Sequence, residues 1–215
     1  MDIGSSSIER SSAVPFVVFE GLDGVGKSTT ARHFAKVIGA EFLATPDREL
    51  AEARRLLEPV FEAHPEARML WYAATVMRVS DRVKGLLRLG RPVVVDRYFL
   101  STLAYAALRG ANLGLTEVEG VLVVPDLTVF LYAPLSVRDS RMRLRSLNST
   151  EDRSTLDAAV DAKLERSFRG YAGRPVAGRF VAVDASVRSP GEISEMLVQM
   201  LGLRTSCGAL SGVVA

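Results

Sequence analysis

The chain has 215 residues, and its 27 lysines and arginines nearly balance its 25 aspartates and glutamates. This length suits one α/β domain and is short for two. The near-neutral balance gives no sign of a nucleic-acid partner, and no run approaches the roughly 20 apolar residues that span a bilayer, so no membrane association is expected. The only cysteine, Cys207, has no partner for an intramolecular disulfide, which fits a reducing cytoplasm.

The two ends of the chain are expected to lie outside the fold. Residues 1–13 are polar and serine-rich and lack the apolar core of a secretion signal, so they are predicted to form a disordered leader. Residues 203–215 have the composition of a flexible tail. A single folded domain is therefore predicted over residues 14–202.

The stretch 16–30 reads FVVFEGLDGVGKSTT, which is an apolar strand, a glycine-rich turn and a helix start. The spacing from Gly21 to Gly26-Lys27-Ser28 fits a phosphate-binding P-loop, and glycines allow positive φ angles that aim backbone N–H groups into one concavity. Lys27 would supply a mobile ammonium for the β- and γ-phosphates, and Ser28 a hydroxyl for Mg²⁺. The predicted ATP-binding residues are Gly21, Gly24, Val25, Gly26, Lys27, Ser28 and Thr29. The alternative, a plain turn with a solvated lysine, is disfavoured because a strand precedes the motif and a helix follows it.

The next segments predict elements that flank a cleft. A helix over 31–38 ends at Gly39, a short strand covers 41–44, and a helix with one apolar face covers 49–61. Arg48 lies between them, either to hold an anion or as a surface residue at a helix start. A long helix is predicted over 67–89, where Trp71, Thr75 and Arg78 share one stripe.

The β-branched run 93–95 predicts a buried parallel strand that ends in Asp96-Arg97-Tyr98. If this strand neighbours the first one, Asp96 emerges beside the phosphate loop and can hold Mg²⁺, while Arg97 can reach a phosphate. The alternative is an acid–base pair that only caps the strand. A helix over 101–109 would turn Tyr105 toward the same cleft.

Further strands are predicted over 127–132 and 179–184, with helices over 116–121, 156–171 and 190–201. The alternation predicts an α/β fold, a parallel sheet covered by helices on both faces. Residues 143–155 are polar and arginine-rich, so a short lid is predicted there, in which Arg143, Arg145 or Arg153 closes over phosphates. The alternative is a solvated charged face.

Together these segments resemble the thymidylate kinase family over about residues 16–201. The matching residues are Phe19 to Thr29 (FEGLDGVGKST), Asp96-Arg97-Tyr98 with Ser101 and Ala104-Tyr105, and Pro125 to Thr128 (PDLT). The resemblance implies a P-loop NTPase-type fold, ATP-dependent γ-phosphoryl transfer to a nucleoside monophosphate such as dTMP, and a homodimer.

Residue roles are implied at the matching positions. Asp23 would lie beside the acceptor, Arg97 would hold its phosphate, and Trp71 would stack on its base. The substrate-binding residues so implied are Asp23, Arg48, Trp71, Thr75, Arg78, Arg97, Tyr98 and Tyr105. Some family members carry a cation inside the P-loop where this chain has Gly24, so the lid arginines are expected to join Lys27, Asp23 and Arg97 as catalytic residues.

Two departures affect base recognition. Thr75 stands where the family usually has an arginine that donates to a thymine carbonyl, and Ala106 stands where a polar residue is common. The acceptor could therefore be another nucleotide, a nucleoside or a small metabolite. Arg78, on the same stripe of the helix, could take the place of the arginine that is missing at position 75. A nucleotide-binding regulatory protein without turnover is the third reading, which the intact Lys27 and Asp96 disfavour.

Overall fold

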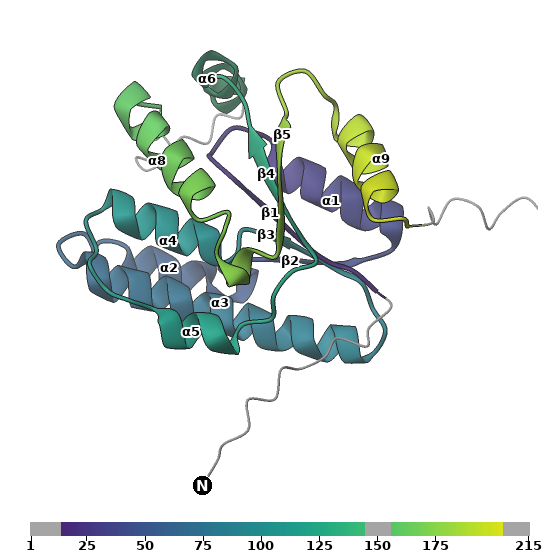
Figure 1. Ribbon diagram of the computed structural model, residues 1–215. Helices are drawn as coiled ribbons and strands as arrows, with labels where there is room; N and C mark the ends of the chain where they lie inside the picture. Colours follow the sequence, from purple (N-terminus) through teal and green to yellow (C-terminus); the bar gives the residue numbers. More distant parts are fainter. Residues whose placement is uncertain (1–13, 145–155, 204–215) are drawn as a thin grey trace, which may run out of the picture.

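A computed structural model describes residues 14–144 and 156–203 of the chain (Figure 1). Five parallel strands form one sheet in the order β2-β3-β1-β4-β5. The prediction of a parallel α/β sheet is thereby confirmed. The strands are β1 (Phe16–Gly21), β2 (Glu41–Ala44), β3 (Val93–Asp96), β4 (Leu127–Tyr132) and β5 (Arg179–Asp184).

Helices cover both faces of this sheet, as predicted. Figure 1 shows α1 and α9 together on one face, with α3, α4 and α8 on the other and α6 above the carboxyl ends of the strands. The helices are α1 (Lys27–Ile38), α2 (Ala51–Leu57), α3 (Pro65–Arg88), α4 (Phe99–Leu108), α5 (Thr116–Val121), α6 (Leu135–Leu144), α8 (Ala158–Gly170) and α9 (Pro190–Met200), with 3₁₀ turns η1 (Arg48–Leu50) and η2 (Pro175–Ala177).

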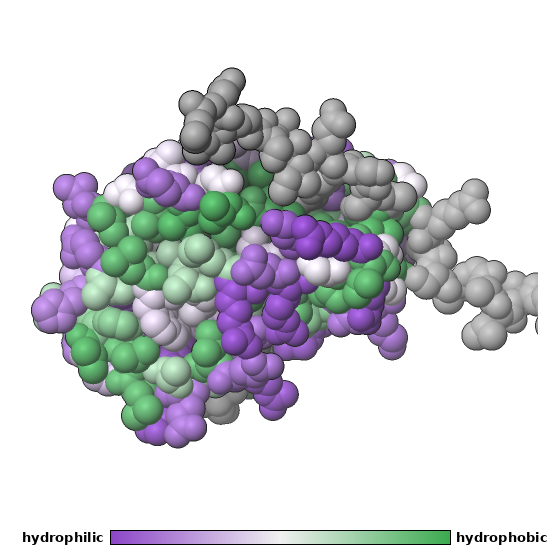
Figure 2. Space-filling view, turned by 90° about the horizontal axis from the view of Figure 1, so that it is seen from below, coloured by the Kyte–Doolittle hydropathy of each residue, from purple (hydrophilic) through white to green (hydrophobic). Residues whose placement is uncertain are grey.

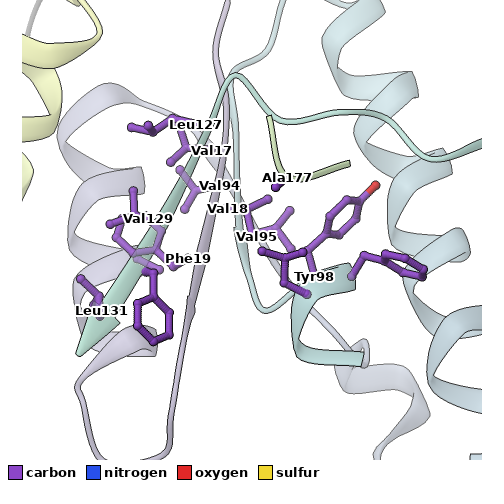
Figure 3. Close-up of a cluster of buried hydrophobic side chains, with 14 of the residues drawn as sticks. Val17, Val18, Phe19, Val94, Val95, Tyr98, Leu127, Val129, Leu131 and Ala177 are labelled. Atoms are coloured by element: carbon purple, nitrogen blue, oxygen red, sulfur yellow. The ribbon is translucent and has the colours of Figure 1, made fainter. Parts of the chain in front are cut away.

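The core follows from strands that are buried on both sides. All six residues of β1 are buried, and alternate side chains along a strand point to opposite faces of the sheet. Figure 3 shows the two resulting layers. One contains Val17, Phe19, Val94, Leu127, Val129 and Leu131, and the other contains Val18, Val95, Tyr98 and Ala177.

The predicted helix over 49–61 is wrong in extent. The structure has the short turn η1 followed by α2, and the segment ends in turns. Leu56 and Val60, which belong to the predicted apolar face, are 58% and 60% exposed. Helix α2 contacts mainly η1 and none of its residues is buried, so its apolar side chains do not enter the core.

Within the described residues no helix is both long enough and apolar enough to span a membrane. The predicted leader, the predicted tail beyond Leu203, Cys207 and lid residues 145–155 lie outside the described part of the chain.

Candidate active site

The turn after β1 lies at the carboxyl edge of the sheet, between β3 and β4, where ligands of open α/β folds bind. Gly21, Gly24 and Gly26 have φ angles of 138°, 82° and 96°. A Cβ on Gly21 would lie 2.2 Å from the carbonyl oxygen of Leu131, so only glycine fits there. Helix α1 begins at the next residue and directs its N-terminal N–H groups toward this turn.

Lys27 is held inside the loop and is not the mobile group that was expected. Its side chain is 6% exposed, and Nζ donates to the carbonyl oxygen of Leu22 at 2.5 Å and lies 3.8 Å from Asp23 Oδ1. Burial lowers the pKa of Lys27 to about 8, and the nearby Arg97 acts in the same direction. The site therefore contains a desolvated ammonium poised for an anion.

Ser28 and Asp96 meet because β1 and β3 are neighbours, as the sequence predicted. Ser28 Oγ donates to Asp96 Oδ2 at 2.5 Å. The other oxygen, Oδ1, is buried and has no hydrogen-bond partner among the described residues. Oxygen ligands of this kind suit Mg²⁺, which commonly takes only one or two carboxylates and fills its shell with phosphates and water. In the described ranges no group of three or more His, Cys, Asp or Glu residues could hold a metal ion.

A cavity of about 460 Å³ adjoins the phosphate loop, which is within the size range of small-molecule sites. The segment after β2, helix α3 and helix α4 form its walls. Its polar lining includes Asp23, Arg48, Arg68, Tyr72, Arg97 and Tyr105. The cavity thus has a cationic end beside the loop and a mixed polar and apolar end at α3.

Asp23 joins the phosphate loop to this cavity. Arg97 donates to its carboxylate, and the Tyr105 hydroxyl donates to Asp23 Oδ2 at 2.8 Å. Burial alone would raise the pKa of Asp23, but the charges of Arg97 and Lys27 outweigh it and lower the pKa below its usual range. Burial raises the pKa of Tyr105, which keeps its hydroxyl protonated as a donor. Asp23 is therefore ionised at neutral pH.

Glu20 is a member of the site that the sequence reasoning missed. It is fully buried, and its Oε1 accepts the N–H groups of Tyr98 at 2.9 Å and Ser101 at 3.1 Å, while Oε2 accepts the Ser101 hydroxyl. Burial raises the pKa of Glu20, and the hydrogen bonds from Ser101 and Tyr98 oppose this. Arg97, with a φ of 66°, directly precedes Tyr98 and donates to Ser101 Oγ at 3.2 Å. The sequence feature that could have revealed Glu20 is its charge inside an otherwise apolar strand.

Two arginines of α6 dock on the outside of the phosphate loop and were also missed. Arg138 is 1% exposed, pairs with Asp161 of α8, and donates from Nε to the carbonyl oxygen of Asp23 at 2.7 Å. Arg141 donates to the carbonyl oxygen of Val25 at 3.1 Å. A Cβ on Gly24 would lie 2.9 Å from the carbonyl oxygen of Arg138, so α6 explains the glycine at this loop position. The sequence feature that could have revealed these arginines is their three-residue spacing, because residues so spaced lie on one face of a helix.

A smaller cavity of about 330 Å³ lies beside α6 on the other side of the loop. Val25, Gly26 and Thr29 border it, together with Arg141 and Arg188. The predicted ATP-binding residues thus lie on the loop or next to this cavity.

Three predicted substrate residues of α3, namely Trp71, Thr75 and Arg78, are not among the residues that line the larger cavity. Trp71 packs against Phe61 and Tyr72, with ring centroids 6.2 and 4.7 Å apart. Thr75 is buried in the helix and its hydroxyl donates to the Tyr72 carbonyl oxygen at 2.7 Å. Arg78 pairs with Asp47, which lines the cavity, and with Glu49, which does not. One residue advances 100° around a helix, so Tyr72 lines the cavity in place of Trp71.

The remaining predicted residues divide between the cavity, the core and the surface. Arg48 lines the cavity. Tyr98 borders it, but its side chain lies in the core, 2% exposed, with the hydroxyl donating to the carbonyl oxygen of Val123 at 3.2 Å. Arg143 is 75% exposed and pairs with Asp139 on the same helix. Arg145 and Arg153 lie outside the described residues.

The sheet order, the glycine-rich loop at the first β–α turn and the Ser28–Asp96 contact define the class of P-loop nucleotide-binding α/β proteins. The sequence profile of the thymidylate kinase family matches residues 19–187. The chain belongs to the thymidylate kinase family, and it is a nucleoside-monophosphate kinase.

Similar proteins agree with this assignment. The chain is 33% identical over 198 residues to the thymidylate kinase of Cereibacter sphaeroides, covering 80% of this chain and 87% of that one. It is 32% identical over 162 residues to the thymidylate kinase of Carboxydothermus hydrogenoformans, covering 66% and 77%. The structure of thymidylate kinase from Candida albicans matches with a TM-score of 0.66 at 21% identity over 88% of this chain and 91% of that chain, which shows a shared fold. The alternative acceptors receive no support from these comparisons.

Proposed function

We propose that the protein transfers the γ-phosphoryl group of ATP to dTMP and forms dTDP and ADP. The observation that carries this proposal is the position of Asp23 between two cations. Lys27 lies in the phosphate loop on one side, and Arg97 lies in the cavity on the other. Two anionic substrates bound to these cations would meet at one point, as in-line transfer requires. The relatives named as thymidylate kinases support dTMP as the acceptor.

In this reaction the loop binds the triphosphate through its backbone N–H groups and Lys27. The smaller cavity beside Thr29 and Arg141 accommodates the nucleoside of ATP. Ser28 and Asp96 hold Mg²⁺, which neutralises charge on the phosphates when it is bound. Arg138 lies fixed behind the loop as a further cation and holds the Asp23 backbone in place.

The acceptor binds in the larger cavity. Arg97 and Arg48 hold its phosphate, Asp23 and Tyr105 contact its sugar, and the base lies against the α3 wall near Tyr72. The second ionisation of a phosphate monoester has a pKa near 6, so the attacking oxygen needs no general base at neutral pH. The protein's task is to align two phosphates and to balance their charge.

Release of ADP, measured in a coupled assay across a panel of nucleoside monophosphates with ATP and Mg²⁺, tests the proposal. The highest kcat/KM is expected with dTMP. Turnover confined to another acceptor, or ATP binding without turnover, would contradict it.

The proposed assembly is a homodimer in the cytoplasm. Leu70, Ala74 and Met77 form one exposed stripe of α3, with Leu70 and Met77 49% and 39% exposed. Figure 2 shows the side of the molecule on which α3 and α5 lie in Figure 1, with hydrophobic residues gathered beside a strongly hydrophilic group. An apolar stripe on a long helix suits burial against the same helix of a second copy. That no nucleic acid binds stays a prediction.

A further inference from the structure

Two buried side-chain oxygens at the carboxyl edge of the sheet have no hydrogen-bond partner in the described ranges. They are Thr45 Oγ1 and Asp96 Oδ1, on residues that are 7% and 8% exposed. A buried polar atom without a partner carries a desolvation penalty, and most such atoms in native proteins are paired. Two of them in one place therefore indicate a ligand.

The two residues are neighbours in space. β2 and β3 are adjacent strands with Ala44 opposite Asp96, and the Thr45 N–H donates to the Asp96 carbonyl oxygen at 3.1 Å. Both residues line the acceptor cavity. Ser28 Oγ contacts the other carboxylate oxygen of Asp96. Thr45 and Asp96 thus lie on neighbouring chain segments at the edge of one cavity, and Ser28 at the start of α1 contacts Asp96.

The chemistry of these groups selects the ligand. A bare phosphate is disfavoured next to the Asp96 carboxylate, because like charges repel. Hydroxyl and carboxylate oxygens suit a hard divalent cation, and Mg²⁺ keeps several water ligands that need hydrogen-bond partners. We propose that Thr45 belongs to the divalent-cation site, where its hydroxyl and Asp96 Oδ1 together hold a water ligand of the ion. This inference rests on the proposed Mg²⁺-dependent function.

The substitution Thr45→Val removes the hydroxyl and keeps the shape of the side chain. Binding of Mn²⁺ to the full chain with saturating ADP, followed by the electron paramagnetic resonance signal of free Mn²⁺, measures the cation site directly. Outer-shell partners typically contribute 10- to 100-fold to metal affinity, so a loss of about tenfold is expected for Thr45→Val. Thr45→Ser keeps a hydroxyl and should bind Mn²⁺ like the wild type.

Thr128→Val is the matched control. Thr128 is 1% exposed, and its hydroxyl donates to the carbonyl oxygen of Ala177 at 2.6 Å, outside the cavity. This variant should melt about 2–4 °C lower and bind Mn²⁺ normally. Thr45→Val breaks no hydrogen bond that the described residues make, so its melting temperature without ligand should equal or slightly exceed that of the wild type.

Three outcomes would overturn the inference. They are unchanged Mn²⁺ affinity in Thr45→Val, a raised acceptor KM with unchanged Mn²⁺ affinity, and a melting temperature lowered as in Thr128→Val. If the wild type bound no Mn²⁺ in the presence of ADP, the proposed cation site at Ser28 and Asp96 would fail together with the inference.

Discussion

The ionisation of Lys27 in the phosphate loop should make the kcat/KM for ATP depend on pH. Its pKa is lowered to about 8, chiefly by burial, so the free enzyme loses the ammonium as the pH rises through that value. Only the protonated form attracts phosphates. The kcat/KM for ATP should therefore fall about tenfold per pH unit above pH 8, because this ratio reports ionisations of the free enzyme.

The matched variant is Lys27→Arg, whose guanidinium stays charged over this range. Its residual activity should be independent of pH between 7 and 10. A wild-type profile that stays flat to pH 10 would show that Lys27 does not titrate as its burial implies.

Glu20 is expected to act as a positioning residue for the acceptor site. Glu20→Gln keeps the size of the side chain, but the amide nitrogen cannot accept the Ser101 hydroxyl, so Ser101 and Arg97 lose their anchor. The KM for the acceptor should rise about tenfold while the KM for ATP changes less than about twofold. Steady-state kinetics with each substrate varied in turn measures the difference.

Glu165→Gln changes an exposed carboxylate on α8 and should leave both KM values unchanged. If Glu20→Gln raised both KM values equally, the carboxylate would serve general folding and would have no specific effect on Arg97.

For single residues, the sequence predicted contacts that depend on strand order and missed those that depend on side-chain direction. Asp96 was placed beside Ser28 because parallel strands end at a common edge. Glu20 was not assigned, since a motif does not reveal which buried group caps the following helix. Trp71 was assigned to the cavity and Tyr72 was not considered, because spacing along a helix defines a stripe and not the direction that it faces.

At the scale of elements, α6 is tied to the phosphate loop and to α8 through one buried side chain. Arg138→Met removes the hydrogen bond to the Asp23 carbonyl oxygen and leaves Asp161 without its cation. Breaking a buried pair typically costs about 3–5 kcal/mol. Asp161 is 20% exposed and can regain water, so a loss of about 2–3 kcal/mol in the free energy of unfolding is expected.

Urea denaturation measures this loss through the transition midpoint at constant slope. Arg143→Met, on the same helix, removes an exposed pair with Asp139 and should change the free energy of unfolding by less than about 0.5 kcal/mol. Equal effects of the two substitutions would contradict the docking of α6 on the loop.

The extents of strands were predictable from short apolar runs between turn residues. The strands over 41–44, 127–132 and 179–184 match their predicted bounds, because each is a short run rich in apolar residues with turn signals beside it. Helix α2 did not match, because its apolar stripe is exposed in the single chain. Periodicity identifies an apolar face, and only the tertiary structure decides whether that face is covered.

At the scale of the whole molecule, the exposed apolar stripe of α3 is the basis of the proposed homodimer. Leu70→Asp would introduce a charge into a contact of two identical faces, so the charge would meet its copy across the two-fold axis. Sedimentation equilibrium should show a dimer for the wild type and a monomer for this variant.

Val187→Asp alters an exposed apolar residue in the β5–α9 connection, far along the chain from α3, and serves as the control. It should remain dimeric. A monomeric wild type, or a Leu70→Asp variant that stays dimeric, would exclude α3 as the interface.

The central claim is that the first β–α turn holds the ATP triphosphate while Arg97 holds the acceptor phosphate. A crystal structure with Mg²⁺, a non-hydrolysable ATP analogue and dTMP tests this claim most directly. The account predicts the β- and γ-phosphates in the Gly21–Ser28 loop beside Lys27 and the dTMP phosphate on Arg97, with Asp23 between them. A triphosphate bound elsewhere, or dTMP outside the cavity between α3 and α4, would contradict it.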